Sequence, residues 1–359
     1  MKKIATVTFH NTTNYGALLQ ALALQKKLEY IGADTEILDY HCQSIEERES
    51  IVIPSMEKNL YRYLTKWKDY FLHRGKRKVI SDFKEKYLKI SNTSYSRSTI
   101  RNANKKYDAF IVGSDMVWEL GITGGDFTYF LNFTTPQKRF SYAASIGVNE
   151  FSLQYRDKAF EELEKFQQIS VREENAAAYL QANIIHDVTV NIDPTLLFDG
   201  EFWEKYEEEV SSLLGKKYIL LYFLDETGVM LKQARKLANR CKADIVILSD
   251  KKMEVEGCKV LTNVSVGQFL FSIHNAFEVI TGSFHGMIYS LNYNRNFMYF
   301  NRANSSRMES IARIVGATSR RLTAESVPDI EFDFMQANNC VERLRHEATA
   351  YLKRIVDEV

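Results

Sequence analysis

The segment TGSFHG, residues 281–286, has the clearest chemical potential in the sequence. It follows the β-rich run 277–281 and precedes a helical pattern that we expect to begin at Met287. Glycines let the backbone approach a ligand closely, and the amides of a helix N-terminus bind phosphate or carboxylate. His285 lies between the glycines, where a bound dianion would raise its proton affinity enough for it to act as a proton donor. We predict that His285 is catalytic and that its neighbours bind an anionic donor: Ser283, Phe284 and Gly286.

A lone histidine is also a common structural residue, and that alternative stays open for His285. The predicted partners of the same anion are arginines, which bind planar carboxylate or phosphate through two parallel hydrogen bonds. Arg172, in the segment SVRE, is predicted to hold the donor as a catalytic residue, with an ion pair to Glu173 as the alternative. Arg302 and Arg307 are predicted donor contacts, with solvation on the surface as their alternative.

Two further polar loops follow β-rich runs and could bind a hydroxyl-rich acceptor. The loop HNTTNYG, residues 10–16, opens a helix and is longer than capping alone requires, although Asn and Thr are also ordinary capping residues. The segment GSDMVW, residues 113–118, combines a glycine, a hydroxyl, a carboxylate and an indole on which a sugar ring could stack. The predicted acceptor residues are Asn14, Tyr15, Gly16, Gly113, Ser114 and Trp118.

Asp115 is predicted to orient or deprotonate the acceptor hydroxyl, and is therefore assigned a catalytic role. Its structural alternative is an N-cap for a helix that would follow it. The sequence has no cluster of carboxylates suited to a metal and no cysteine pair with zinc spacing, so we expect neither a metal nor another cofactor.

These loops need a scaffold that brings strand ends together, and the chain supplies one. Short apolar runs alternate with longer helical patterns, which is typical of βαβ units and parallel sheets. In such α/β sheets ligands bind beyond the carboxyl ends of the strands, which is where the loops lie. We predict two Rossmann-like doubly wound domains: an N-terminal one over 1–205 with helical insertions at about 43–104, a C-terminal one over 206–335, and a final helix over 336–359 that could pack back on the first domain.

Composition restricts the classes of partner. Lysine plus arginine number 47 against 46 acidic residues, so the overall field gives no reason to expect nucleic acid. The four cysteines are scattered, the N-terminal apolar run ends too early for a signal peptide, and no stretch approaches the roughly 20 apolar residues of a membrane span. We expect a cytoplasmic protein with reduced thiols. The sequence does not indicate an oligomeric state.

Taken together and in order, seven segments resemble the polysaccharide pyruvyl transferase family. They span nearly the whole chain and read TFHNTTNYGALLQALALQKKL, YDAFIVGSDMVW, SYAASIG, ISVREENAAAYL, IDPTLLF, ITGSFHGMIYSLNYNRNF and SSRMESIARIVG. The resemblance implies two Rossmann-like domains facing each other across a cleft, as in GT-B glycosyltransferases. It also implies phosphoenolpyruvate as donor, a sugar of a cell-surface polysaccharide or its lipid-linked precursor as acceptor, and a cyclic ketal as product.

Carried over by residue, the histidine of the SFHG motif is His285 and the arginine of the SVRE motif is Arg172. The chain departs from the pattern beyond this histidine, because it has Ser305 between Arg302 and Arg307 where some members carry a lysine. Two other functions remain open at this stage. One is a glycosyltransferase using a nucleotide sugar, for which Glu309 is the candidate ribose-binding residue, and the other is a non-catalytic sugar-binding protein of the same fold.

The segment 58–78 interleaves aromatic residues with eight lysines and arginines, and Asp69 is its only acid. We interpret it as a solvated helix packed on the first domain by four side chains: Tyr61, Leu64, Trp67 and Phe71. The alternative is a peripheral contact with the inner face of the membrane, since an amphipathic helix with aromatic and basic residues suits an anionic lipid surface.

Overall fold

A computed structural model describes residues 2–54, 56, 59–225, 228–250, 252–301, 306–323 and 332–359. The chain forms two compact units, each described by itself below. The first comprises Met1–Phe71, Lys84–Leu197 and Leu344–Val359, and the second comprises Leu72–Phe83 and Phe198–Arg343. The division along the chain therefore falls after Leu197 rather than near 205, and residues 72–83 of the expected insertion cluster with the second unit.

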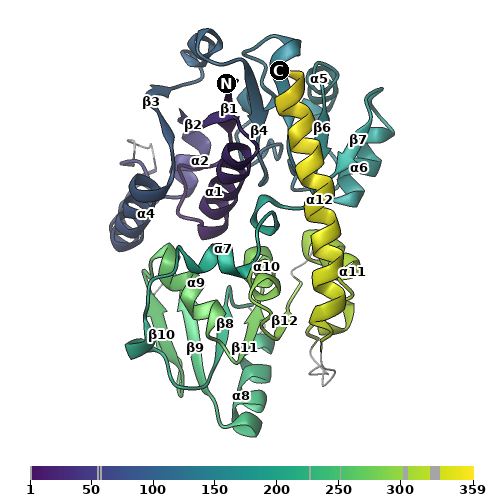
Figure 1. The fold of residues 1–359 in the computed structure, drawn as a ribbon. Helices are drawn as coiled ribbons and strands as arrows, with labels where there is room; N and C mark the ends of the chain where they lie inside the picture. The colour runs from purple at the N-terminus through teal and green to yellow at the C-terminus, as the bar shows by residue number, and fades with distance from the viewer. Residues whose placement is uncertain are drawn as a thin grey trace. The chain divides into compact units, whose positions relative to one another are not determined.

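The first unit is built on a parallel sheet with the strand order β3-β2-β1-β4-β5 (Figure 1). Isolated bridges from Phe140 to Gln168 and from Ala144 to Val171 continue the sheet into the parallel pair β6 and β7. The strands are Lys3–Val7 (β1), Asp34–Tyr40 (β2), Ile90–Tyr95 (β3), Ala109–Val112 (β4), Arg139–Ser141 (β5), Ile169–Val171 (β6) and Val188–Val190 (β7). Strand order reverses between β1 and β4, which is where doubly wound sheets bind ligands.

The helices of this half are Tyr15–Tyr30 (α1), Gln43–Arg48 (α2), Leu60–Leu72 (α3), Leu153–Leu163 (α5) and Glu174–Gln181 (α6). Helix α4, Arg74–Tyr87, is divided between the units, because the residues up to Phe83 cluster with the second unit and those from Lys84 with the first. Helix α1 begins at its N-cap Asn14, whose side chain accepts from the Gly16 amide, and the chain leaves it through Gly32 at φ 94°. Nearly every residue of α1 is buried, in keeping with its apolar sequence. On one face of the sheet, Ala5, Val7, Phe110 and Val112 join a large aromatic core.

The second unit repeats the same topology, with the parallel order β10-β9-β8-β11-β12. Its strands are Tyr218–Tyr222 (β8), Asp244–Ser249 (β9), Lys259–Thr262 (β10), Glu278–Thr281 (β11) and Phe297–Tyr299 (β12). Its helices are Gly200–Glu204 (α7), Val229–Cys241 (α8), Val266–His274 (α9), Phe284–Asn292 (α10) and Ser306–Ile314 (α11). Strand order reverses here between β8 and β11.

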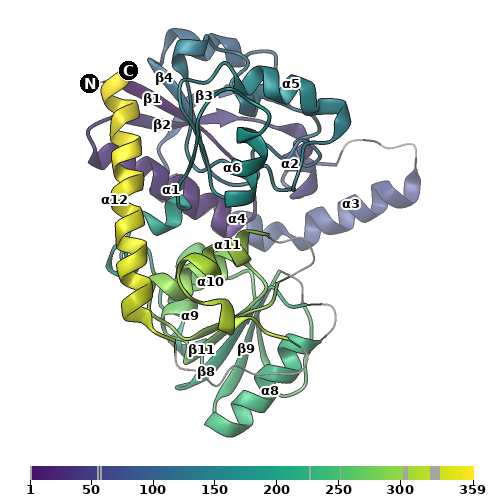
Figure 2. The same cartoon turned by 90° about the vertical axis from the view of Figure 1, so that its right-hand side faces the viewer.

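Alternation along the strands distributes the core of the second unit over two faces. Ile219 and Leu221 of β8 pack with Met230 and Ala234 of α8, while the intervening Leu220 faces the other side. Helix α10 packs against β11, β12 and α9, and Figure 2 shows α9 and α10 on the opposite side of the sheet from α8. The start of α10 therefore lies at the carboxyl end of a fully buried strand.

The last helix, α12 (Phe334–Glu358), begins two residues before the expected position 336. Its C-terminal part, from Leu344 onward, belongs to the first unit. There the Tyr351 hydroxyl donates to the Ser141 carbonyl at 3.0 Å and the Arg345 Nε donates to the Leu196 carbonyl at 2.7 Å. The packing face of this part is buried and consists of Ala348, Tyr351, Leu352 and Ile355.

Two strands were missed by the sequence patterns, β3 inside the expected helical insertion and β10 after β9. Both are edge strands with largely exposed or half-buried residues. The four cysteines are free thiols. Among the helices that the structure describes, none combines the length and apolarity that crossing a bilayer would require.

Candidate active site

In the first unit, the loops after β1 and β4 meet at the point where strand order reverses. The Thr8 hydroxyl donates to the Ser114 carbonyl at 3.1 Å and accepts from the Gln20 side chain at 2.8 Å. Gly113 lies so close that a Cβ on it would be 3.1 Å from the Cβ of Thr8. The structure thus brings together two of the loops predicted to bind the acceptor.

The predicted acceptor residues differ in their access to a ligand. Asn14 is exposed, whereas the others of its loop and the glycine and serine after β4 are buried: Tyr15, Gly16, Gly113 and Ser114. The loop after β1 also performs the capping role that was its alternative, since Asn14 Oδ1 accepts from the Gly16 amide at 2.9 Å. The Asn14 side chain and the loop backbone are therefore the groups through which this loop could contact a sugar.

Arg172 lies at the end of β6 in a buried network of polar side chains. Its Nε donates to Glu173 Oε1 at 3.1 Å and one terminal nitrogen donates to Asp193 Oδ2 at 2.6 Å. The Ser114 hydroxyl donates to the same Asp193 oxygen at 3.0 Å, and the Ser145 hydroxyl donates to Glu173 Oε1 at 2.7 Å. This network ties β6 to the loop after β4.

These contacts show the ion pair that was the alternative for Arg172, while its role in holding the donor stays a prediction. Its side chain is 3% exposed and is paired with two internal carboxylates, so the alternative of an ion pair with Glu173 is the arrangement present. Burial alone would lower the pKa of the guanidinium, but Glu173 and Asp193 raise it above its ordinary value. Two carboxylates therefore surround the one guanidinium in this network.

Asp115 has an uncommon backbone conformation, with φ 75°, and is 6% exposed. Its Oδ1 accepts from the amide of the adjacent Met116 at 2.8 Å. No α-helix follows it in the described chain before α5, so the N-cap alternative does not apply. The left-handed conformation is one that aspartate tolerates through local hydrogen bonding, and it turns the side chain back on the strand end.

Trp118 does not provide the sugar-stacking surface that we predicted. It is fully buried, its indole N–H donates to the Tyr129 carbonyl at 2.8 Å, and its ring stacks on Phe130 with centroids 5.6 Å apart. Phe166 packs edge-on against the same ring. The indole therefore belongs to the aromatic core of the first unit.

A second polar cluster, which the motif analysis missed, lies beyond the carboxyl ends of β1 and β2. His10 Nε2 lies 3.1 Å from Asp39 Oδ1, and burial lowers the pKa of this imidazole. Asp39 also accepts from Ser94, and these hydrogen bonds outweigh burial and lower the pKa of its carboxyl. The sequence feature that could have predicted this cluster is position, because His10 and His41 each follow a strand within a few residues.

The same cluster continues toward α2. His41 Nδ1 lies 2.6 Å from Glu46 Oε1, which also accepts from the Asn11 amide at 3.1 Å, and Asn11 in turn accepts from Lys84. Burial lowers the pKa of Lys84. Among the residues that the structure describes, no group of three or more histidine, cysteine or acidic side chains is arranged to hold a metal ion. The cluster is therefore a hydrogen-bond network of donors and acceptors.

In the second unit, the SFHG motif forms the junction of β11 and α10. The helix begins at Phe284, three residues before the expected Met287, so that His285 is in its first turn. Ser283 is the N-cap, and its hydroxyl accepts from the Gly286 amide at 3.4 Å. Thr281 Oγ1 accepts from the Ser283 amide at 3.0 Å and donates to the Tyr222 carbonyl at 3.0 Å, which fixes the junction to β8.

Gly286 is required at this junction by close packing. A Cβ on it would come within 2.4 Å of Thr281 Oγ1. Ser283 and Gly282 are partly exposed, whereas His285 is 7% exposed and has its ring edge-on to Phe284 at 5.2 Å. An anion at Ser283 would therefore meet the positive end of α10, in whose first turn His285 lies.

The remaining predicted donor residues lie after β12. Arg302 is outside the described residues, and Arg307 is half-buried in the first turn of α11, which packs against α10. Glu309, the candidate for binding ribose, accepts from Asn301 at 3.0 Å and from the Tyr299 hydroxyl at 3.3 Å, and pairs with Arg321 at 3.3 Å. The Glu309 carboxylate thus already has hydrogen-bond and ion-pair partners within the second unit.

The order and spacing of these motifs match a known family. The model of the family described as polysaccharide pyruvyl transferase matches residues 14–304. The chain belongs to the polysaccharide pyruvyl transferase family. The matched range includes the β11–α10 junction and the loops after β4 and β6. A comparison of the sequence with curated proteins finds no match.

Solved structures share the fold of this pyruvyl transferase family member. A UDP-GlcNAc 2-epimerase from Methanocaldococcus jannaschii, in complex with UDP-GlcNAc and UDP, has a TM-score of 0.52 at 13% identity and covers 99% of each chain. An S. aureus MnaA–UDP structure has a TM-score of 0.51 at 15% identity over 97% of this chain and 91% of that one. The likeness to these GT-B-type proteins, with the sheet order, shows two Rossmann-like domains.

Proposed function

We propose that this family member transfers pyruvate from phosphoenolpyruvate to a sugar of a cell-surface polysaccharide or of its lipid-linked precursor. The family match over residues 14–304 supports this proposal most strongly. The β11–α10 junction supports the choice of donor, because a helix N-terminus with a buried histidine beside it suits a small, doubly anionic enol.

The chemistry assigns a proton donor to this junction. Phosphoenolpyruvate is an enol phosphate, so addition of an alcohol at C2 requires a proton at the methylene C3. We assign that proton to His285, while Ser283, Phe284 and Gly286 bind the anion through the first turn of α10. A sugar hydroxyl bonds to C2, phosphate leaves with the C2–O electron pair, and a second hydroxyl of the sugar closes the ketal. Arg307, on the neighbouring α11, is the proposed further contact of the donor.

The acceptor is assigned to the first unit because of its charge. Its strand ends carry Asp39, Glu46, Glu49, Asp115, Glu173 and Asp193 against two buried or half-buried cations, Lys84 and Arg172. Carboxylates accept hydrogen bonds from sugar hydroxyls, whereas they repel a dianionic donor. Asp115 is the proposed base or orienting group for the attacking hydroxyl, and Asn14 the proposed sugar contact.

The nucleotide-sugar alternative has weaker support. The similar solved structures that bind UDP show the fold alone at their identities of 13% and 15%. Glu309, the residue that would bind ribose, is held by Tyr299, Asn301 and Arg321. Thermal shifts with phosphoenolpyruvate against a panel of nucleotide sugars separate the two donors, because only a bound ligand stabilises the folded chain.

The decisive experiment incubates the protein with phosphoenolpyruvate and candidate lipid-linked oligosaccharides and follows the pyruvyl mass increment and phosphate release. His285→Ala should lower the rate by on the order of 10²- to 10⁴-fold, the usual contribution of general acid catalysis. His186→Ala is the matched control, because His186 is a partly exposed histidine of the first unit, paired with Glu164. Full turnover by His285→Ala would remove its catalytic role, and sugar binding without phosphate release would favour a non-catalytic protein.

A further inference from the structure

Helix α3 has an apolar face that the described part of the chain leaves exposed. None of its 13 residues is buried, although its sequence is strongly amphipathic. Leu60 is 68% exposed, Leu64 58% and Phe71 61%, with Tyr61 at 79%. The expected packing of Tyr61, Leu64 and Phe71 on the first domain is therefore wrong. A 13-residue helix is only marginally stable in water without tertiary contacts, so this face calls for a partner.

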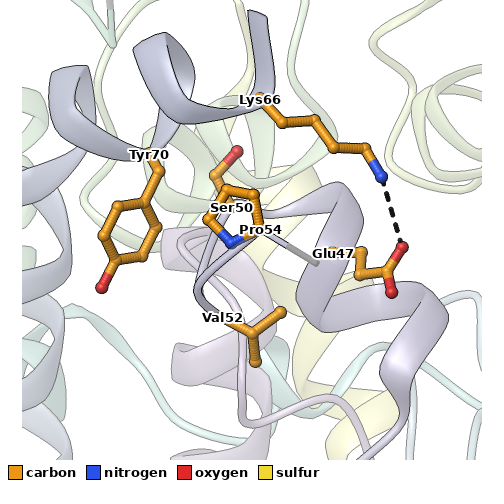
Figure 3. Close-up of a pocket in the computed structure, with 6 residues that line it drawn as sticks. All are labelled: Glu47, Ser50, Val52, Pro54, Lys66 and Tyr70. Carbon is orange, nitrogen blue, oxygen red and sulfur yellow. Dashed lines mark ion pairs between the residues drawn. The ribbon is translucent and has the colours of Figure 1, made fainter. Parts of the chain in front are cut away.

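One edge of α3 contacts the rest of the first unit, and this contact determines which side of the helix is left exposed. Tyr70 and Lys66 line a small open pocket with Glu47, Ser50, Val52 and Pro54, and Lys66 pairs with Glu47 at 3.5 Å (Figure 3). On a helical wheel, Leu60, Leu64, Trp67 and Phe71 lie within one narrow stripe, turned away from Lys66. Figure 2 shows α3 lying apart from the strands of the first unit.

The rings on α3 are organised rather than scattered. Trp67 stacks on Phe71 with centroids 5.5 Å apart, and Tyr63 and Tyr70 pack edge-on against the same indole at 6.3 and 5.9 Å. Tyrosine and tryptophan rings with apolar bodies and polar tips are enriched where a protein meets the headgroup region of a bilayer. The stripe thus has an apolar centre, Leu60, Leu64 and Phe71, bordered by amphipathic rings.

Charge identifies the kind of surface that would cover this stripe. The segment 58–78 contains eight lysines and arginines and one acid, in a chain whose net charge is +1. The rest of the chain therefore carries a net charge of about −6, so that positive charge is concentrated around α3. Arg62 and Lys68 of the helix are exposed. Anionic headgroups attract each nearby lysine or arginine by about 1 kcal/mol.

We propose that α3 docks the enzyme on an anionic lipid membrane, with Leu60, Leu64 and Phe71 inserted among the acyl chains and the basic residues on the headgroups. An acidic protein partner would satisfy the charge but gives no reason for an apolar stripe bordered by tyrosine and tryptophan. Docking would bring the enzyme to the surface that holds a lipid-linked acceptor, and this consequence, unlike the docking itself, rests on the proposed function.

The test is sedimentation of the full chain with vesicles of phosphatidylcholine, with and without phosphatidylglycerol, at low and high salt. The protein should sediment with the anionic vesicles and be released by salt. Leu64→Gln with Phe71→Gln should weaken this binding by about 10-fold or more, because two apolar side chains lose their insertion energy. The matched control replaces Leu153 and Ile185, which are 79% and 92% exposed elsewhere on the first unit, by glutamine. It should bind like the unmodified protein.

Fluorescence gives an independent readout. Of the three tryptophans, Trp118 and Trp203 are fully buried, so a blue shift of emission on adding anionic vesicles reports Trp67. Absence of sedimentation and of any shift at low salt would overturn the proposal, as would equal binding by the α3 variant. The proposal would also be overturned if the unmodified protein were a dimer in the absence of lipid and the α3 variant were a monomer, because the stripe would then bind a second copy of the chain. Turnover with a water-soluble acceptor should be the same in the α3 variant as in the unmodified protein. If no protein showed turnover although the unmodified protein bound vesicles, the result would count against the proposed function and not against membrane docking.

Discussion

At the scale of single residues, Arg172 links the strand ends of the first unit through a network of buried carboxylates. Its guanidinium holds Glu173 and Asp193, and the Ser114 hydroxyl shares the Asp193 oxygen. Ser114 belongs to the loop after β4, next to the proposed base Asp115. Arg172 is therefore a positioning residue that fixes the end of β6 to the acceptor loop.

Replacing Arg172 by methionine tests this role. The variant leaves Glu173 and Asp193 buried without their cation, so the free energy of unfolding should fall by about 3–5 kcal/mol in urea titrations. The comparison is Arg156→Met, since Arg156 pairs with the 88% exposed side chain of Asp157 at 3.3 Å, and such surface pairs contribute about 0–1 kcal/mol. An Arg172→Met protein of unchanged stability with a raised KM for phosphoenolpyruvate would instead restore the donor-binding role.

Residue types alone could not separate these roles. The sequence placed His285 and Ser283 at a strand end correctly, because glycine, serine and a following apolar helix are local signals. The surroundings of Trp118 and Arg172, by contrast, are formed by residues distant in the sequence. The aromatic core around Trp118 includes Phe166, 48 positions away, and Asp193 reaches Arg172 from beyond β7. No local pattern reports such partners.

At the scale of elements, the junction of β11 and α10 is the most tightly specified part of the candidate site. Ser283 caps the helix, Thr281 ties the cap to β8 through the Tyr222 carbonyl, and Gly286 lets the first turn close over Thr281. The first-turn amides proposed to bind the donor are therefore held by packing, not by the loop sequence alone.

Gly286→Ala should disturb this junction, because its Cβ would lie 2.4 Å from Thr281 Oγ1, an atom held by two hydrogen bonds. We expect a loss of about 1–3 kcal/mol in thermal unfolding, the usual cost of overpacking, together with weaker stabilisation by phosphoenolpyruvate. Adding Thr281→Ala removes the clashing oxygen, so the double variant should cost less than the sum of the single ones. A Gly286→Ala protein as stable as the unmodified chain would show that the junction adapts freely.

The elements that sequence patterns located best are those buried on both sides. Strand β11 begins one residue after the start of the expected run 277–281 and ends with it, because an apolar run buried on both faces marks it. The edge strands β3 and β10 read ISNTSY and KVLT and have exposed or half-buried faces, so they lack that signal. They join the sheets through backbone hydrogen bonds, which a sequence does not display.

At the scale of the whole molecule, one topology occurs twice without a recognisable sequence repeat. Both units order their first five strands in the same way, with the reversal between the first and fourth. Each reversal carries its own chemistry, acidic side chains in the first unit and a helix N-terminus with a histidine in the second. The fold thus fixes where ligands bind, while the residues after each strand decide which ligand suits each unit.

The C-terminal half of α12 is part of the first unit although Tyr351 lies 210 positions from Ser141, whose carbonyl it binds. Leu352→Ala should lower the stability by about 2–5 kcal/mol, because Leu352 is fully buried and the change leaves a cavity. Met335→Ala, near the exposed start of the same helix and 74% exposed, should change it by less than about 0.5 kcal/mol. In the Leu352→Ala variant, amide hydrogen exchange should accelerate around Ser141 and Leu196, whose carbonyls accept hydrogen bonds from Tyr351 and Arg345. Acceleration confined to α12 itself would show that the helix covers the first unit without supporting it.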